Sequence, residues 1–406
     1  MSKHLIKIDN PQHCAISVAH AGLDNQYCEA GEVVAIDWQP SSGWGLQEAH
    51  YTDEDGNVVA IDLSVREFTM PAKAIVVSAT AKRFVIEDWT KGIGKNTKGT
   101  AFNRPTLGID DAGFEYYDET FKKKILWNGD YWVNVDGTPM PLTFIAAEDA
   151  STISLTQVGV ATLTDDYEYS LDGLTWNSYT IGDVVTLAHV GDFIQMRGEN
   201  TATGESNSIY KQFVMTGKVY SSGDVTSLLN GIGGIIVIGS YGLYKLFLND
   251  ESLITPPQVP SSQVDSNGCC SMFDGCINLV ESPLLAAETL GSTAYASIFN
   301  GCLKIVKTGQ VRAKVLATNC FRAMFQDCKK VKSYHFATMN GSVLTFRNND
   351  SCAKFVIDDP VPPTLAAQTL VGLKADCIIY VPAGSVDAYK AKQYWSARAA
   401  YIQAIP

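Results

Sequence analysis

Residues 272–279 read MFDGCINL, residues 298–305 read IFNGCLKI, and residues 324–331 read MFQDCKKV. The Phe residues recur every 26 positions, and a fourth, Phe247, lies one step upstream. Units this short cannot bury their own apolar sides, so neighbours stack and share one core. We therefore predict a solenoid over residues 225–350. Its core slots are Phe247, Phe273, Phe299 and Phe325, then Cys276, Cys302 and Cys328, then Leu253, Leu279, Ile305 and Val331.

The recurring Cys slot has two interpretations. A metal site needs several ligands close together, but each repeat supplies one regularly placed Cys without an aligned His or Asp, and Asp250 occupies the first slot. Cys269 and Cys270 are adjacent but have no second pair at a suitable spacing. We therefore predict small, buried, apolar thiols, no metal site and no cofactor.

Residues 271–305, SMFDGCINLVESPLLAAETLGSTAYASIFNGCLKI, resemble the BspA-like leucine-rich repeats that are common in Bacteroidetes and their phages. Residues 378–405, IIYVPAGSVDAYKAKQYWSARAAYIQAI, resemble the end segment of such arrays, with a strand, a turn containing Pro and Gly, and a helix, and we predict a cap over residues 351–406. The resemblance implies a leucine-rich repeat solenoid with a C-terminal cap that covers its last core face. For function it implies a binding scaffold with many targets.

The N-terminal segment, residues 1–83, alternates apolar and polar residues as strands do. Its FTMPA stretch, residues 68–72, resembles the signature that precedes the last strand of small β-repeat modules in bacterial surface proteins. Residues 84–98 are predicted to be a linker. The GIGKNTKG run there lacks the spacing of a phosphate-binding loop.

Residues 99–140 contain RPT, then DAGFEYYDET, then KKILWNGDYWV. This pattern resembles a short module of phage tail-fibre and related virion proteins. We predict a hairpin that turns at NGD. Its Tyr116, Tyr117, Trp127 and Trp132 either pack across strands, which we favour, or stack on sugar rings.

Residues 141–224 are predicted to form an Ig-like β-sandwich, with turn chemistry in SLDGLTW, residues 170–176. They resemble the domain that precedes BspA-like repeats in gut-bacterial and gut-phage proteins. The predicted fold class is therefore multidomain and mainly β: small β-modules and an Ig-like sandwich, followed by a BspA-like solenoid and its cap.

The sequence contains no recognisable catalytic motif. None of the six His residues has a metalloprotease or triad context; they are His4, His13, His20, His50, His189 and His335. The acidic pairs Asp110–Asp111, Asp165–Asp166 and Asp358–Asp359 are interpreted as solvated loop residues. DDYEYSLDG, residues 165–173, does not have the spacing of a known calcium loop. We predict no catalytic residue and no enzyme.

Charge and hydropathy restrict the partners. The net charge of −12 argues against nucleic acid and anionic membranes as the main partners. No apolar run approaches the length of about 20 residues that spans a bilayer, so we predict no membrane insertion. MSKHLIKIDN lacks the charged-then-apolar profile of a secretory signal, so we expect synthesis in the host cytoplasm and release by lysis.

These features predict a non-enzymatic virion protein, a tail or head fibre or receptor-binding protein, that attaches to a host cell-surface glycan or protein. Its other predicted partners are virion proteins and copies of itself, with a trimer favoured. The alternatives are an adhesin on the bacterial cell surface and a polysaccharide depolymerase. The candidate ligand contacts are Tyr295, Phe321, Arg322 and Tyr334. Tyr295 and Phe321 share a repeat slot with Leu243, which favours a core position for both.

Overall fold

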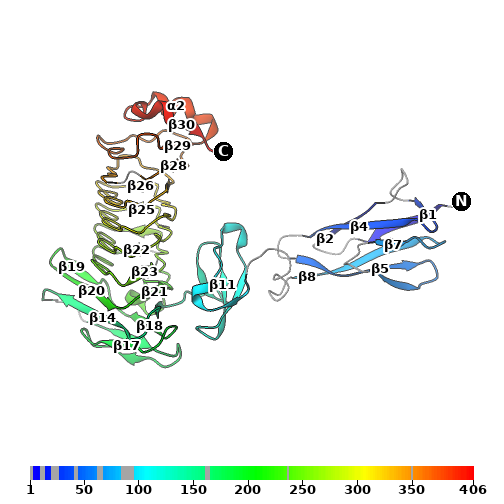
Figure 1. Ribbon diagram of the computed structural model, residues 1–406, viewed down its shortest axis with the longest axis horizontal. Coiled ribbons are helices and arrows are strands. Elements are labelled where there is room, and N and C mark those ends of the chain that lie inside the picture. Colours follow the sequence, from blue (N-terminus) through cyan, green and yellow to red (C-terminus); the bar gives the residue numbers. More distant parts are fainter. Residues whose placement is uncertain are drawn as a thin grey trace. The chain divides into compact units, whose positions relative to one another are not determined.

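A computed structural model describes residues 3–9, 14–19, 27–40, 44–61, 67–83, 96–160, 165–235, 237–348 and 351–406. The chain is mainly β, with many short strands in several small sheets (Figure 1), which confirms that part of the prediction. It divides into two compact units, residues 1–97 with 113–116, and residues 98–112 with 117–406. Residues 84–95 of the predicted linker, and also His13 and His20, lie outside the described residues.

The first unit contains two sheets. Successive side chains of a strand point to opposite faces, so apolar residues at every second position can be buried together. In β8, Ile75 and Val77 are buried, and Met70 of the FTMPA stretch joins the same core. One sheet has the order β3-β1-β8-β5-β6 and the other β2-β4-β7. The strands are β1 (Lys3–Asp9), β2 (Cys14–Ala19), β3 (Tyr27–Glu29), β4 (Val33–Pro40), β5 (Trp44–Asp53), β6 (Val58–Ile61), β7 (Glu67–Thr69) and β8 (Ile75–Arg83).

A small sheet of order β12-β11-β10-β9 follows, and apart from residues 113–116 its residues belong to the second unit. Its central hairpin turns at residues 128–131, where the Asn128 side chain accepts hydrogen bonds from the N–H groups of Asp130 and Tyr131. We call residues 98–140 the hairpin module. Its elements are β9 (Lys98–Gly99), β10 (Glu115–Asp118), β11 (Lys123–Trp127), β12 (Trp132–Asn134) and two 3-10 helices (Ala101–Asn103, Ile109–Asp111).

Two further sheets follow, with the orders β16-β15-β18-β13-β21-β23 and β17-β14-β20-β19. Buried side chains from both, such as Phe144 in β13 and Phe213 in β20, join one core. We call residues 141–222 the two-sheet segment. Its strands are β13 (Leu142–Ala146), β14 (Ser151–Val158), β15 (Tyr167–Ser170), β16 (Asn177–Ser178), β17 (Val185–Leu187), β18 (Phe193–Gly198), β19 (Gly204–Ser206), β20 (Ile209–Thr216) and β21 (Val219–Ser222).

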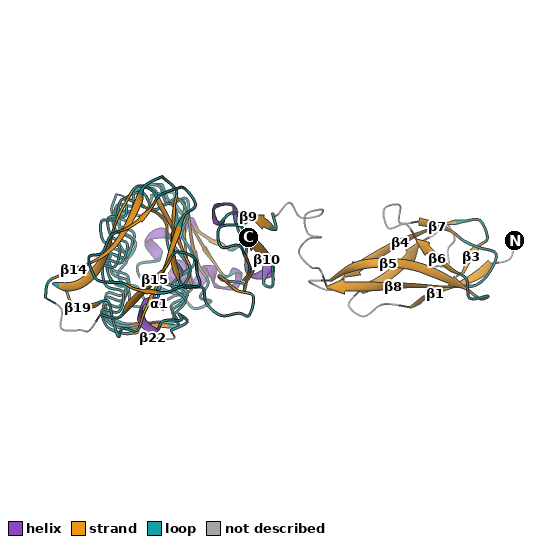
Figure 2. Cartoon of the chain, turned by 90° about the horizontal axis from the view of Figure 1, so that it is seen from below, coloured by secondary structure: helices purple, strands orange, loops and turns teal. Residues whose placement is uncertain are grey.

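The repeats form a stack of coils, residues 237–340, with one coil per 26 residues. Short strands pair in parallel, Val237 with Gln263, Gln263 with Thr289, and Thr289 with Val315. Each pairing therefore joins residues one period apart, and the coils overlie one another when seen along the stack (Figure 2). Helix α1 (Ser227–Asn230) precedes the coil stack, whose strands are β22 (Val237–Ile238), β23 (Leu253–Thr255), β24 (Gln263–Val264), β25 (Thr289–Leu290) and β26 (Val315–Leu316).

Strand β23 of the first coil pairs in parallel with β21 of the preceding segment. The sheet therefore continues across the predicted boundary between residues 224 and 225. One buried apolar cluster extends from Leu142 to Ile402. The two-sheet segment thus covers the open end of the first coil, as a terminal cap does in a repeat array.

One side of each coil consists of consecutive tight turns that hydrogen-bond to the equivalent turns of the next coil. In the second coil, the N–H groups of Cys269, Ser271 and Phe273 donate to carbonyls of the next coil at 2.9–3.0 Å. The N–H of Met272 instead donates to the Cys269 carbonyl three residues back. Backbone N–H groups thus alternate between bonds to the next coil and bonds within the turn. In this arrangement every fourth residue has left-handed backbone angles, and Asn267 is one of them, with φ of 59°. Asn tolerates that region better than β-branched residues do.

Thr293 occupies the same slot one coil later, with φ of 56°, while Asn319 has φ of 58° two coils later. Replacing Thr293 by Asn should therefore stabilise the protein by about 0.5–1 kcal/mol, because it relieves backbone strain. Urea unfolding measures the change. Thr293→Val is the comparison variant and should destabilise, because it keeps the branched side chain and also loses the hydroxyl that donates to Asn267 Oδ1 at 2.7 Å. An Asn variant less stable than the natural protein would contradict this account of the slot.

The chain ends in a second parallel sheet of order β27-β28-β29-β30. Trp395 and Tyr389 are fully buried beneath the last strands, and the indole N–H of Trp395 donates to the Pro363 carbonyl at 2.9 Å. These large rings close the far end of the core. The elements are β27 (Ser333–Phe336), β28 (Lys354–Ile357), β29 (Ile378–Val381), a 3-10 helix (Ala383–Ser385), α2 (Val386–Ala391), a 3-10 helix (Ser396–Tyr401) and β30 (Ile402–Ala404).

Candidate functional site: a cleft between the hairpin module and the coil stack

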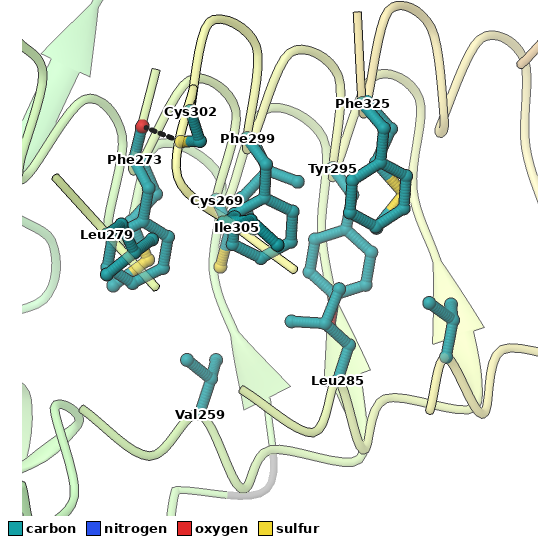
Figure 3. Close-up of a cluster of buried hydrophobic side chains, with 14 of the residues drawn as sticks. Val259, Cys269, Phe273, Leu279, Leu285, Tyr295, Phe299, Cys302, Ile305 and Phe325 are labelled. Atoms are coloured by element: carbon teal, nitrogen blue, oxygen red, sulfur yellow. Dashed lines mark hydrogen bonds between the residues drawn. The ribbon is translucent and has the colours of Figure 1, made fainter. Parts of the chain in front are cut away.

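The Phe slot forms a stacked ladder through the coils (Figure 3). The ring centroids of Phe247, Phe273, Phe299 and Phe325 are 5.3, 5.6 and 5.4 Å apart, with interplanar angles of 5°, 7° and 15°. Phe213 of β20 continues the ladder, 5.3 Å from Phe247. All predicted core slots are at most 1% exposed, which confirms their burial.

The Cys slot adds a second regular contact. The thiols of Cys276, Cys302 and Cys328 each donate to the carbonyl of a Phe one coil earlier, at 3.0, 3.1 and 2.9 Å. Burial raises the pKa of each of these thiols well above its ordinary value. They are therefore protonated donors, whereas metal binding requires thiolates. Across the described part of the chain, no cluster of three or more His, Cys, Asp or Glu is placed to hold a metal ion.

The predicted ligand contacts need correction. Tyr295, Phe321 and Tyr334 are fully buried, so proposing them as surface contacts was wrong. Tyr295 and Phe321 follow Leu243 at 26-residue steps, and that slot faces the interior of every coil. Tyr334 packs in β27 against the ring of Phe325 at 4.8 Å. Arg322 alone of the four is exposed.

A cleft of about 510 Å³ lies where the hairpin module meets the coil stack. Trp127, Asp130 and Trp132 line it from the hairpin side, and Tyr220 to Ser222 of β21 form part of its wall. The opposite wall consists of equivalent turns from three successive coils. These turns span residues 255–258, 281–284 and 307–312.

An ion pair joins the two sides of the cleft. Arg312 donates from both terminal nitrogens to the Asp130 carboxylate, at 2.6 and 2.7 Å. This paired geometry is among the stronger charge-assisted contacts in proteins, and it holds the pKa of Arg312 above its ordinary value. A polar row continues from Arg312 through Gln310 to Asp358, whose carboxylate lies 2.8 Å from His335 Nε2. The hairpin module is thus fixed to the third coil.

Ring contacts fix the hairpin module to the two-sheet segment as well. Phe102 packs edge-on against Tyr220 with centroids 4.8 Å apart, and Phe121 packs against Phe193 at 5.1 Å. Gln258 of the first coil donates to the Trp132 carbonyl at 3.2 Å. The cleft therefore has walls held in place by several independent contacts.

The aromatic residues of the hairpin module divide between core and cleft. Tyr116 and Trp132 are buried, while Tyr117 is 39% exposed and lies outside the cleft. Trp127 is half-buried, pairs edge-on with Trp132 at 5.6 Å, and donates from its indole N–H to the Gly108 carbonyl at 2.8 Å. Packing across strands accounts for Trp132. Trp127 also presents part of its ring to the cleft.

Polar side chains complete the opposite wall. Glu281 and Lys307 are exposed neighbours on adjacent coils, joined by a parallel backbone bridge. Gln310 is half-buried beside them. These groups and the Trp127 indole line the same cleft. Such a lining suits a sugar, which offers an apolar ring face and several hydroxyl groups.

Several of the acidic residues singled out in the sequence form local contacts. Asp165 pairs with the buried ammonium of Lys211 at 2.7 Å, and Asp111 accepts a hydrogen bond from the Gly108 N–H. Asp172 accepts from two backbone N–H groups and the Ser170 hydroxyl, which lowers its pKa. These carboxylates therefore already have structural partners.

Sequence reasoning missed the Asp130–Arg312 pair because the two residues are 182 positions apart in the chain. No signal in a single sequence connects them. The repeat does predict that Arg312 lies on a turn of its coil. No family model matches this chain, and no curated protein matches it.

Proposed function

We propose that this chain is a non-enzymatic attachment protein of a bacteriophage virion, a tail or head fibre component that binds a glycan or protein on the host surface. The observation that supports this best is the cleft, whose aromatic and polar walls are tied together by the Asp130–Arg312 pair. The continuous core from Leu142 to Ile402 supports it further, because a rigid body loses little freedom when it binds.

The resemblances named above supply the finer part of this proposal. The coil stack is proposed to be a BspA-like leucine-rich repeat solenoid, and the two-sheet segment an Ig-like sandwich. The hairpin module is proposed to be the fibre-type module, with the N-terminal unit as a spacer toward the particle. We propose a symmetric trimer on the virion, because several weak sites on one particle gain avidity through effective concentration.

Competition with phage particles tests this function. Purified chain added to Bacteroidetes host cells should slow the adsorption of the phage that carries it, because both occupy one receptor. Trp127→Ala should weaken cell binding by about three- to ten-fold, the range expected for one lost aromatic contact. Tyr117→Ala removes an exposed ring outside the cleft and is the matched control, with no effect expected.

Three results would contradict the proposal. Purified chain that leaves adsorption unchanged would remove the attachment function. Labelling of uninfected cell envelopes by an antibody against residues 225–406 would favour the bacterial adhesin. New reducing ends after incubation with capsular polysaccharide would identify a depolymerase.

Among the described residues, no helix has the length and apolar character needed to cross a bilayer.

A further inference from the structure

Positive charge is concentrated in one part of this acidic chain. Residues 289–348 contain nine Lys and Arg but a single acidic residue, Asp327, while the whole chain has a net charge of −12. Two of the nine are neutralised, since Arg312 pairs with Asp130 and Lys314 with Glu288. The other seven are not in ion pairs within the described residues. They are Lys304, Lys307, Arg322, Lys329, Lys330, Lys332 and Arg347.

Five of these cations lie on one face of the third and fourth coils, on the turns that follow the Cys slot. We call them the lysine face: Lys304, Lys307, Lys329, Lys330 and Lys332, all exposed. Lys304 and Lys330 occupy the same slot, one period apart. The N–H of Lys332 donates to the Val306 carbonyl at 3.1 Å, so the two turns are direct neighbours.

The spacing of these charges follows from the stacking. Adjacent parallel backbones lie about 4.8 Å apart. Lysines in equivalent slots of two coils are therefore close enough to repel one another, and no acidic residue lies between them in those slots. Leu303 and Val306, 38% and 46% exposed, lie among the lysines. The face therefore combines ammonium groups that form no ion pair with small apolar patches, and within it only Lys307 has an acidic residue, Glu281, in the same slot one coil earlier.

We propose that the lysine face binds an anionic polysaccharide, one bearing sulfate or carboxylate groups on its sugars, at the host surface. This rests on the proposed attachment function and names its ligand class. Ammonium groups attract such anions as point charges, and Leu303 and Val306 offer apolar contact to sugar ring faces. Lys307 also lines the cleft, so one polysaccharide chain can cross the face and place a sugar beside Trp127.

The charge distribution favours a polysaccharide over nucleic acid. Outside residues 289–348 the chain is strongly acidic, which repels a long polyanion of high charge density. A site confined to two coils matches a few sugars, whereas duplex DNA carries one charge per about 1.7 Å and engages an extended basic surface.

Binding of the full chain to dextran sulfate, alginate and neutral dextran, measured by titration calorimetry, tests the proposal. The triple variant Lys304→Gln, Lys330→Gln, Lys332→Gln should weaken binding to one of the two charged polymers at least about ten-fold. It should also flatten the salt dependence, because fewer counterions are released. The matched control removes three exposed lysines elsewhere, Lys98→Gln, Lys218→Gln, Lys392→Gln, and should change affinity by less than about two-fold.

Equal losses in the two triple variants would overturn the proposal, because they would show a response to net charge alone. Tighter binding of duplex DNA or of anionic lipid vesicles than of either charged polysaccharide would also overturn it. If the lysine variant competes with phage adsorption as well as the natural chain does, the attachment function stands and the lysine face is not its ligand site. Thermal unfolding of both triple variants verifies that they are folded.

Discussion

Replacing Phe299 by Ala is expected to lower the free energy of unfolding by about 3–5 kcal/mol, the usual cost of removing a buried aromatic side chain. Phe299 is fully buried and stacks on Phe273 and Phe325, with ring centroids 5.6 and 5.4 Å away. The closely stacked coils cannot collapse to fill the space, because backbone hydrogen bonds fix their separation. Urea unfolding of the full chain measures the loss.

Val306→Ala is the control for this experiment. Val306 lies one turn further along the same coil but is 46% exposed, so its truncation should cost less than about 1 kcal/mol. A loss for Phe299→Ala as small as that of the control would mean that the Phe ladder does not form the shared interior of the coils.

Replacing Asp250 by Ala is expected to destabilise the junction between the two-sheet segment and the coil stack by about 3 kcal/mol or more. The carboxylate is 5% exposed and accepts hydrogen bonds from the N–H groups of Met215, Ser252 and Leu253, at 3.0, 2.8 and 3.1 Å. Ala leaves these donors buried without an acceptor, at about 1–3 kcal/mol each when fully unsatisfied. The exposed Asp376→Ala is the control and should change little.

This junction also explains why the first repeat departs from the Cys pattern. In later coils the Cys thiol faces a Phe carbonyl of the preceding coil and donates to it. At Asp250 the preceding neighbour is β20, which presents the Met215 N–H. The slot therefore requires an acceptor, and Asp250→Cys should be nearly as destabilising as Asp250→Ala.

The stability of the junction is expected to depend on pH, and the burial of Asp250 determines the direction. Desolvation raises the pKa of Asp250 to about 6 in the folded protein, from an ordinary value of 3.8. Between these values the folded state binds more protons than the unfolded state, so this group's contribution to stability falls as the pH rises. The loss of stability in Asp250→Ala should therefore be larger at about pH 5 than at about pH 7. An equal or smaller loss at the lower pH would contradict the raised pKa.

The repeat was readable from sequence because it is local and regular. Phe, Cys and Leu recur at fixed offsets every 26 residues, and a buried slot in one coil implies a buried slot in the next. The same slot logic, applied strictly to Leu243, Cys269, Tyr295 and Phe321, places the two aromatic residues in the core. Aromatic character alone favours ligand binding, but the repeat slot decides the position of both residues.

The junction and the cleft depend on contacts that no periodicity encodes. The pairing of β21 with β23 joins segments that composition alone separates at residues 224 and 225. The Asp130–Arg312 pair brings a hairpin turn to a coil turn 182 residues later. Trp127 could be named from sequence as an aromatic of the hairpin, but its exposure to a cleft depends on that long-range contact.

Hydrogen exchange of the full chain tests most directly whether one core joins the two-sheet segment to the coil stack. The measurement compares peptides from β20, which contain Phe213, with peptides from the second and third coils, which contain Phe273 and Phe299. The shared core predicts that both sets are protected by the same opening free energy and lose protection together in mild urea. Exchange of the β20 peptides while the coil peptides stay protected would show two independent bodies, and would contradict the account.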